Sequence, residues 1–313
     1  MIEDGALAVR ERPDPEPGSH EVLVRVRAAG LNGADMHQRM GPYPAPPGSP
    51  QDIPGLELAG EVAALGPGAD RFDEGDRVMA IVGGGGQAEL ALVHERAAMP
   101  VPDSLDWAEA GGLPEVFVTA HDALFSQAAL RPGEHLLVHG GAGGVGTAGI
   151  QLGRAAGARV TATVRNEELR PEVEALGADA VAPDGFEERG PFDVVLELVG
   201  APNLPANVSS LATGGRIVVI GVGAGAKGEL NLVALMGKRG RIGASMLRAR
   251  PLEEKAIAMR LVEREVLPLF DDGTLKIPLA ATYSLEDVEE AYERFTTGGK
   301  LGKIVLLTAK SSG

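Results

Sequence analysis

The spacing of hydrophobic and polar positions changes along the chain and divides it into two kinds of region. Residues 20–27 alternate between apolar and polar side chains, which is typical of a half-buried β-strand. From there to residue 113, short segments are separated by turns rich in Pro and Gly, among them residues 41–48 and 83–86. This first region therefore predicts a small, irregular β-barrel.

Beyond residue 113, short apolar runs alternate with helical patterns. We expect strands at 135–139, 160–164, 193–198 and 216–220, a short one around Val181, and helices at 115–130, 145–156, 167–176 and 252–270. Such alternation predicts a parallel sheet covered by helices. The tail returns to a strand from residue 277, a helix over 285–295 and a strand over 303–307, and is expected to complete the barrel domain. The predicted class is α/β, with a barrel domain at 1–113 and 250–313 and a doubly wound domain at 114–249.

A glycine-rich loop follows the first strand of the predicted parallel sheet. Residues 141–146 read G-A-G-G-V-G, which matches G-x-G-x-x-G at Gly141, Gly143 and Gly146. In a strand–turn–helix context the glycines permit a tight turn, a close approach to a pyrophosphate and tight helix packing. The amides where the helix begins, at Gly144 and Val145, then face the phosphates. The pattern predicts a dinucleotide site; a glycine-rich turn without a ligand is the alternative.

The end of the next strand indicates which dinucleotide is bound. An NAD site usually has Asp or Glu there, whereas this chain has Val164-Arg165-Asn166. The planar guanidinium of Arg165 suits a 2′-phosphate, and Arg170 is a second candidate. The sequence therefore favours NADPH; two surface arginines neutralised by neighbouring glutamates are the alternative.

Composition narrows the function further. The chain has 313 residues with 29 Lys+Arg against 44 Asp+Glu, and its net charge of −15 argues against nucleic acid or an anionic membrane as the main partner. It has no cysteine, which excludes disulfides, thiolate metal sites and thiol nucleophiles. Because it also lacks a long apolar run and a signal-peptide core, we expect a cytoplasmic protein.

Several segments together carry a resemblance that covers nearly the whole chain. They are A-A-G-L-N-G-A-D (28–35), G-L-E-L-A-G-E-V (55–62), G-G-G-G-Q-A-E-L (83–90), L-P-E-V-F-V-T-A (113–120), V-H-G-G-A-G-G-V-G-T-A (138–148), S-M-L-R-A-R (245–250) and G-K-I-V-L (302–306). The chain resembles the medium-chain dehydrogenase/reductase superfamily, in particular its zinc-free NADPH:quinone oxidoreductases of the zeta-crystallin type. The resemblance implies a GroES-like barrel domain and a Rossmann domain, with the cofactor between them.

The zinc-dependent relatives differ at the positions of their metal ligands. Their ligands are the Cys of C-x-x-D and the His of G-H-E, which here read N-G-A-D at 32–35 and G-L-E at 55–57. Asn and Leu do not replace thiolate and imidazole, and the six histidines are scattered, so no metal site is expected. Without a Lewis acid, the predicted reaction is NADPH-dependent reduction of a small quinone or another acceptor, such as an activated alkene, that takes electrons through its own chemistry.

The resemblance also implies roles for individual residues. Asn32, Asp35 and Tyr43 align with polar positions of the substrate cleft; a helix cap at Asn32 and Asp35 and loop packing by Tyr43 are the alternatives. On the cofactor side, the implied residues are Thr119, Gly221, Met246 and Leu247 around the nicotinamide and Lys303 near the pyrophosphate. An ordinary helix hydroxyl at Thr119 and a solvated lysine at Lys303 are the alternatives.

Departures from the family pattern and rival functions complete the expectations. The usual first strand is nearly absent, Leu169 replaces a usual Lys, and the segment 183–191 is short and expected to lack a helix. An enoyl-thioester or enone reductase of the same fold is the main rival. A non-enzymatic NADPH-binding protein, including an RNA-binding relative, is another, against which the charge argues. The family also implies a homodimer through an edge of the cofactor domain, for which the apolar strand region 216–222 is the only local support.

Overall fold

A computed structural model describes residues 1–41 and 43–308, and it divides into two compact units. We call the first the barrel unit; it comprises Met1–Val118, Leu247–Gly298 and the chain from Lys303 on. We call the second the sheet unit; it comprises Thr119–Met246 and Gly299–Gly302. Each unit has its own hydrophobic core.

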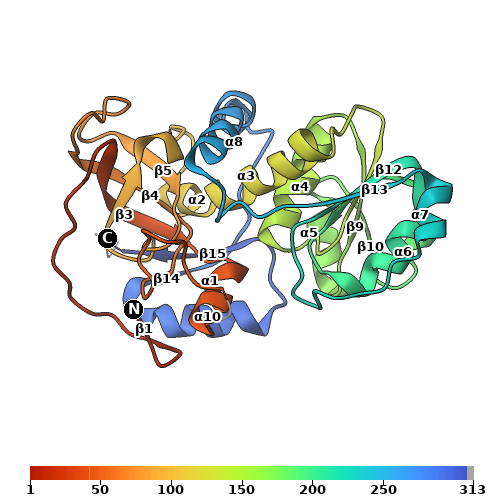
Figure 1. Cartoon of the computed structure of the whole chain (residues 1–313), viewed down its shortest axis with the longest axis horizontal. Helices are drawn as coiled ribbons and strands as arrows, with labels where there is room; N and C mark the ends of the chain where they lie inside the picture. Colours follow the sequence, from red (N-terminus) through yellow and green to blue (C-terminus); the bar gives the residue numbers. More distant parts are fainter. Residues whose placement is uncertain (42, 309–313) are drawn as a thin grey trace. The chain divides into compact units, whose positions relative to one another are not determined.

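The barrel unit is built on one seven-stranded sheet (Figure 1). Its strands are β3 (Glu21–Gly30), β4 (Glu57–Leu65), β5 (Arg77–Ile81), β6 (Leu90–His94), β7 (Ala98–Pro100), β14 (Leu279–Ser284) and β15 (Lys303–Leu307). The order is β14-β15-β3-β4-β5-β7, with β6 also paired to β3. In β3 the alternation predicted from sequence holds, because Val22, Val24 and Val26 are buried while Arg25 is exposed. The C-terminal strand β15 pairs with β3 and so extends the sheet of this unit.

Helices fill the remaining sides of the barrel unit. They are α1 (Gly33–Arg39), α2 (Trp107–Gly112), most of α3 (Pro114–His121), α8 (Leu252–Glu265), α9 (Pro268–Asp271) and α10 (Val288–Thr297). The predicted helix over 252–270 is thus two helices, and Pro268 begins the second, where its missing N–H costs nothing. In place of the usual first strand there is a short hairpin of two antiparallel strands with two residues each, β1 (Ile2–Glu3) and β2 (Ala6–Leu7).

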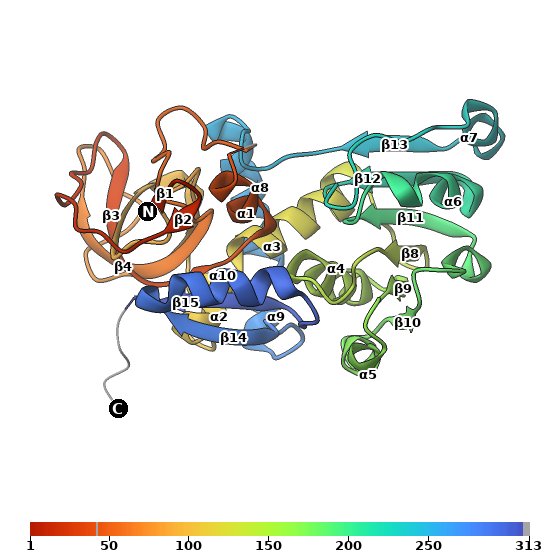
Figure 2. The same cartoon turned by 90° about the horizontal axis from the view of Figure 1, so that it is seen from below.

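The sheet unit contains a six-stranded parallel sheet, seen strand by strand in Figure 2. Its strands are β8 (His135–Val138), β9 (Arg159–Thr163), β10 (Asp179–Val181), β11 (Phe192–Glu197), β12 (Leu211–Val219) and β13 (Arg241–Ala244). The order β10-β9-β8-β11-β12-β13 runs outward in both directions from the first strand, β8. This is the doubly wound Rossmann order, which places ligands beyond the carboxyl ends of the central strands. The structure confirms the predicted fold class.

Helices α4 (Gly144–Ala155), α5 (Arg170–Glu174), α6 (Leu204–Ser209) and α7 (Leu232–Lys238) complete the sheet unit. Two predictions need correction here. The segment 183–191 does contain a short 3-10 helix, Phe186–Arg189, anchored by the buried ring of Phe186. The expected helix over 115–130 is α3 followed by a π-helical segment, Asp122–Gln127. No helix in the described part of the chain is both long and apolar enough to span a membrane.

Candidate active site and cofactor-binding loop

A buried ion pair organises the polar centre of the barrel unit. The Lys303 ammonium, at the start of β15, lies 2.6 Å from Glu57 Oε1, at the start of β4. Lys303 also donates to Asn32 Oδ1 at 2.7 Å and to the Leu31 carbonyl at 2.7 Å, so all three of its N–H groups are used. Gly30 makes room for this arrangement, since a Cβ there would stand 2.3 Å from Glu57 Oε1. Lys303 is therefore a buried cluster residue and not the solvated lysine that was the alternative.

Asn32 is held from both ends of its amide. Its Oδ1 accepts from Lys303, and its Nδ2 donates to Glu57 Oε1 at 2.9 Å. The other contact of Nδ2 is a long one, 3.4 Å to the Gly30 carbonyl. One amide N–H of Asn32 is thus only weakly bonded and is the more available for another acceptor.

Asp35 and Glu115 add two further carboxyl groups to this cluster. Asp35 is fully buried and accepts from the backbone N–H groups of Asn32 (2.8 Å) and Gly55 (3.0 Å), so it acts as a cap of α1 and of a turn. Burial raises the pKa of Asp35 to about 7, against the two backbone bonds, which lower it. Burial also raises the pKa of Glu115 to about 8, and the charge of Glu57 adds to the rise. Among the described residues, Glu115 Oε2 is buried without a hydrogen-bond partner.

This raised pKa predicts how stability depends on pH. Because burial holds the pKa of Glu115 in the folded protein at about 8, above its ordinary value of 4.5, its contribution to stability is full below pH 4.5 and is lost as pH rises toward about 8. We expect Glu115→Gln, which keeps the neutral shape, to gain stability relative to the wild type as pH rises through this interval. Thermal unfolding of both proteins near pH 4.5 and near pH 8 measures this difference in stability. The exposed Glu254→Gln is the control, and a constant difference between Glu115→Gln and wild type would contradict the prediction.

Tyr43 is held by a buried arginine from a distant part of the chain. Arg248 is 2% exposed; its Nε donates to the Gly83 carbonyl at 2.8 Å and its Nη1 to the Tyr43 carbonyl at 3.2 Å. Its guanidinium carbon lies 5.1 Å from the centre of the Tyr43 ring, within range of a cation–π interaction. Nη2 reaches Gln38 Oε1 on α1. Arg248 therefore joins three segments of the barrel unit and fixes the loop that carries Tyr43.

In the sheet unit, the glycine-rich loop has the form that phosphate binding requires. Gly143 is the N-cap of α4, and the first N–H groups of a helix lack intrahelical partners and favour anions. A Cβ on Gly141 would stand 2.8 Å from the Ala162 Cβ, and one on Gly146 would stand 2.3 Å from the Gly140 carbonyl oxygen. Gly143 is different, because it is exposed and a Cβ added there would have the Gly140 carbonyl oxygen as its nearest neighbour, at 3.4 Å. The first and third glycines thus serve packing, and the second keeps the loop surface open.

The other predicted cofactor residues of the sheet unit fall at its strand and helix ends. Thr119 is 9% exposed, and its hydroxyl has no hydrogen-bond partner among the described residues. Gly221 follows β12 and donates to the Glu197 carbonyl, where a Cβ would stand 2.3 Å from the Leu198 carbonyl oxygen. Met246 is the last residue of this part of the sheet unit and is 62% exposed, whereas Leu247 is buried in the barrel unit.

Two arginines lie at and after the carboxyl end of β9. Arg165 is exposed and, within the described residues, makes no hydrogen bond or ion pair. Arg170 begins α5 and pairs with Glu167 at 3.4 Å. Arg165 is therefore the freer of the two for a bound anion.

Comparison with known proteins agrees with both halves of this description. A model of the alcohol dehydrogenase GroES-like domain matches residues 18–103, and a model named zinc-binding dehydrogenase matches residues 176–306. The quinone oxidoreductase of Rattus norvegicus is 33% identical over an alignment of 306 positions that covers 94% of this chain and 91% of that protein. The quinone oxidoreductase of Homo sapiens is 33% identical over 309 residues, with the same coverage.

Solved structures give the same result. An alcohol dehydrogenase superfamily protein from Novosphingobium aromaticivorans matches with a TM-score of 0.87 and 29% identity, covering 98% of this chain and 97% of that one. A mycobacterial protein in complex with NADPH matches with a TM-score of 0.84 and 26% identity, covering 96% and 94%. The chain belongs to the medium-chain dehydrogenase/reductase superfamily. It is an oxidoreductase with a GroES-like domain and an NAD(P)-binding fold, as the sequence resemblance predicted.

The residues present fit the dinucleotide that this family uses. The open face at Gly143, the start of α4 and the unpartnered buried hydroxyl of Thr119 are groups that a phosphate and a polar ring would satisfy. No three His, Cys, Asp or Glu side chains within residues 1–41 and 43–308 are grouped so that they could hold a metal ion.

Sequence reasoning found some members of the barrel cluster and missed others. Asn32 and Asp35 were singled out for the substrate cleft and Lys303 for the pyrophosphate, and the structure brings the three together around Glu57. Glu57, Glu115 and Arg248 were not, although each lies in a quoted family segment. A charged residue at the start of a largely apolar strand, as at Glu57 in β4, was the signal that could have found one of them.

Proposed function

We propose that this protein reduces small quinones with NADPH and without a metal ion. The observation that carries the proposal is the bonding of Asn32: at the position aligned with the first zinc ligand of metal-dependent relatives stands an amide fixed between Lys303 and Glu57. The similarity to quinone oxidoreductases at 33% identity over most of the chain supports the same acceptor class.

We propose that the sheet unit binds the cofactor and that the barrel unit binds the acceptor. In the sheet unit, the amides at the start of α4 bind the pyrophosphate, Arg165 binds the 2′-phosphate, and the Thr119 hydroxyl meets the nicotinamide. Bound NADPH supplies the reducing equivalents. In the barrel unit, Tyr43 and Asn32 orient a flat acceptor.

Asn32 is suited to stabilise charge that develops on an acceptor oxygen. The Lys303 ammonium, 2.7 Å from Asn32 Oδ1, polarises the amide and strengthens its N–H groups as donors. The N–H on the 3.4 Å contact with Gly30 is the one that an acceptor oxygen takes over. A preorganised donor of this kind lowers the barrier without a protein nucleophile.

Reduction of an enone or enoyl thioester is the second candidate, and one observation favours it. A reduced alkene needs a proton at carbon, whereas a reduced quinone takes its protons from water. With a pKa of about 8, Glu115 retains a proton at neutral pH. The barrel unit therefore holds an internal acid that quinone reduction does not require.

A turnover screen separates these candidates. NADPH oxidation is followed with 1,4-benzoquinone, a simple enone and a crotonyl thioester, in the presence of EDTA. We expect the quinone to be the best acceptor and EDTA to have no effect. Tyr43→Phe should keep most of the quinone activity, because no proton is required of its hydroxyl. A preference for an alkene, together with a large loss of activity in Tyr43→Phe, would favour the second candidate. Zinc that is bound to the protein and that EDTA removes together with the activity would contradict the metal-free mechanism.

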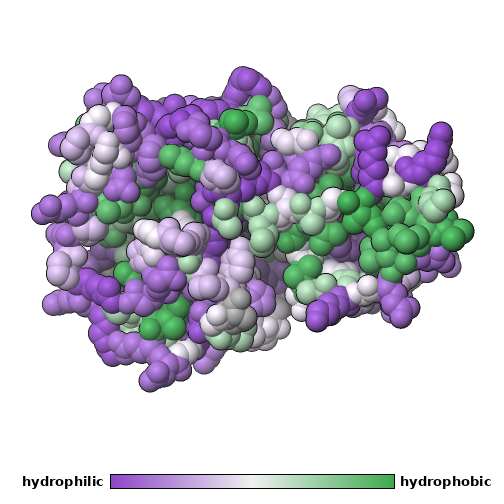
Figure 3. Space-filling model, in the orientation of Figure 1, coloured by the Kyte–Doolittle hydropathy of each residue, from purple (hydrophilic) through white to green (hydrophobic). Residues whose placement is uncertain are grey.

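We also propose that the protein is a homodimer paired through β13. β12 is an interior strand, so the predicted edge is corrected: β13 is the edge strand, and all four of its residues are exposed. Beside it, α7 exposes Leu232 (63%), Val233 (77%) and Met236 (73%), and Figure 3 shows hydrophobic residues gathered there. An unpaired strand edge next to an apolar patch suits pairing with a second copy.

A charge in this patch should therefore produce a monomer. We expect Val233→Asp combined with Met236→Asp to halve the mass measured by light scattering after size exclusion, because two carboxylates would be desolvated in the interface. Ile257→Asp, on an exposed apolar position of α8 (60%), is the matched control and should remain dimeric. A monomeric wild type would reject the proposal.

A further inference from the structure

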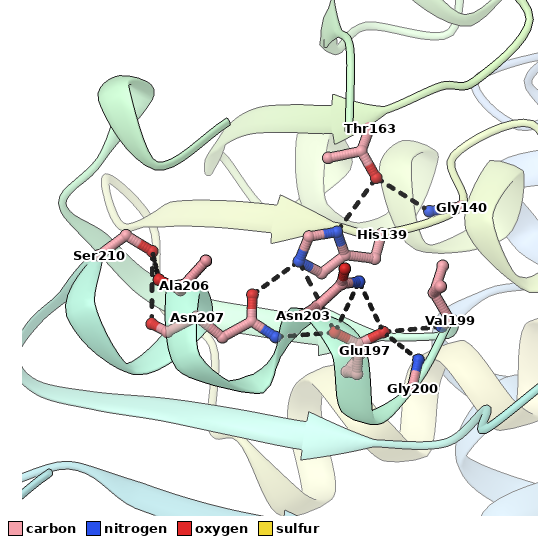
Figure 4. Close-up of polar contacts among 10 residues, drawn as sticks. All are labelled: His139, Gly140, Thr163, Glu197, Val199, Gly200, Asn203, Ala206, Asn207 and Ser210. Atoms are coloured by element: carbon pink, nitrogen blue, oxygen red, sulfur yellow. Dashed lines mark hydrogen bonds and ion pairs between the residues drawn. The ribbon is translucent and has the colours of Figure 1, made fainter. Parts of the chain in front are cut away.

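Four polar side chains lie buried together where central strands of the sheet unit end (Figure 4). His139 follows β8, Thr163 ends β9, Glu197 ends β11, and Asn207 lies in α6. None is more than 2% exposed. Buried polar groups are costly unless they are bonded, and here each one is bonded to the next.

The bonds fix the direction of each donor. Asn207 Nδ2 donates to Glu197 Oε2 at 2.7 Å, so Asn207 Oδ1 is the acceptor in its 2.7 Å contact with His139 Nε2. His139 therefore carries its proton on Nε2, and its Nδ1 accepts from the Thr163 hydroxyl at 3.1 Å. Burial lowers the pKa of His139, which favours the neutral ring that this pattern requires.

One end of this chain of bonds reaches the glycine-rich loop. Thr163 Oγ1 accepts from the Gly140 N–H at 3.2 Å, and the Thr163 carbonyl accepts from the Gly141 N–H at 3.0 Å. The Gly140 carbonyl in turn accepts from the N–H of Gly143, the N-cap of α4, at 3.0 Å. The position of Gly140 therefore sets where α4 begins.

The other end reaches the loop after β11. Glu197 Oε1 accepts from the N–H groups of Val199 (2.7 Å) and Gly200 (2.8 Å). Val199 also packs near the glycine-rich loop, since its Cγ2 lies 3.6 Å from where a Cβ of Gly140 would stand. The two loops are thus joined twice, by packing and through the buried bonds.

We propose that Thr163 is a positioning residue for cofactor binding: it holds the backbone at Gly140 directly, and through His139 and Asn207 it is joined to Glu197 and the loop after β11. The inference rests on the proposed function, because it takes the glycine-rich loop at 141–146 as the phosphate site. Thr163 does not touch the cofactor in this role; it acts through the backbone of Gly140 and through Glu197.

The sheet provides a matched control at its opposite end. His135, at the start of β8, bonds through Nε2 to Thr161 Oγ1 at 2.9 Å. Thr161 lies on β9 two residues before Thr163, and both are 2% exposed. Thr161→Val and Thr163→Val are therefore the same chemical change in the same strand against the same type of partner. Of these two hydroxyls, only that of Thr163 is bonded to Gly140, the residue directly before the glycine-rich loop.

The first experiment measures cofactor binding and kinetics in both valine variants of the full chain. We expect Thr163→Val to raise the Kd and KM for NADPH about five- to tenfold, as for the loss of one or two neutral hydrogen bonds, with kcat for 1,4-benzoquinone little changed. Thr161→Val should bind NADPH as the wild type does, even if its Tm falls as far as that of Thr163→Val. Thr163→Ser, which keeps the hydroxyl, should restore binding.

Two outcomes would overturn the inference. Equal NADPH affinity in Thr161→Val and Thr163→Val, with wild-type binding intact, would reject it and leave the proposed function standing. A wild type that does not bind NADPH would reject the proposed function and this inference together.

A second measurement tests whether the loops are coupled. In Thr163→Val without cofactor, we expect the amides of Val199 and Gly200 to exchange with deuterium faster than in the wild type, although the substitution lies on another strand. In Thr161→Val their exchange should be unchanged. Unaltered exchange of these amides in Thr163→Val would reject the coupling through His139.

Discussion

Gly143→Val should fold like the wild type and lose NADPH binding. The backbone at Gly143 is extended, with φ −75° and ψ 166°, which a β-branched residue adopts without strain. The residue is exposed, and its new Cβ would meet only the Gly140 carbonyl oxygen, at 3.4 Å. The added side chain would instead stand in front of the first N–H groups of α4, where the pyrophosphate is proposed to bind.

The expected loss is large because several bonds fail together. Each charge-assisted hydrogen bond to a phosphate oxygen is worth about 1.5–3 kcal/mol, so the loss of two weakens NADPH binding by about a hundredfold or more. Titration of NADPH fluorescence measures the affinity, and thermal unfolding measures the fold. Gly146→Ala is the contrasting variant: its Cβ would stand 2.3 Å from the Gly140 carbonyl oxygen, so the fold itself should lose stability. A Gly143→Val protein that binds NADPH normally would contradict the placement of the phosphate site.

The sheet unit was the part that sequence patterns predicted best, and the reason is local. Apolar runs such as 194–196 are buried on both faces and need no distant partner to be recognised as strands. The handedness of parallel crossovers then leaves few possible strand orders. The glycine-rich loop is also local, since strand, loop and helix are contiguous in the chain.

The barrel cluster was only partly predictable because its members are far apart in sequence. Lys303 and Asn32 are 271 positions apart, and no spacing rule connects them. Arg248 reaches the loop of Tyr43 from 205 positions away. Lys303 comes to lie beside Asn32 and Glu57 only because β15 pairs with β3, and this long-range pairing cannot be predicted from local sequence. The edge strand β13 was missed for a different reason: R-I-G-A is too short and too exposed to show a strand pattern.

The choice between NADPH and NADH should depend on Arg165. It stands two residues beyond the end of β9, where an NAD-binding relative places an acid, and it is free of partners among the described residues. Its planar guanidinium matches a 2′-phosphate. Removing one such contact costs about 1.5–3 kcal/mol, so Arg165→Ala should raise the KM for NADPH by about ten- to a hundredfold. The KM for NADH, which lacks the phosphate, should change little.

Arg170 provides the internal comparison for this prediction. It lies after the same strand, but its Nη1 is already paired with Glu167 at 3.4 Å, while its buried Nε has no hydrogen-bond partner among the described residues. A phosphate must compete with this carboxylate, so Arg170→Ala should change the NADPH preference less than Arg165→Ala does. Steady-state kinetics of both variants with both cofactors and a fixed quinone decide the matter. Equal use of NADPH and NADH by the wild type would remove the basis for assigning a 2′-phosphate contact to either arginine. A larger effect at Arg170 would instead show that the ion pair between Arg170 and Glu167 breaks on binding and that the phosphate lies nearer α5.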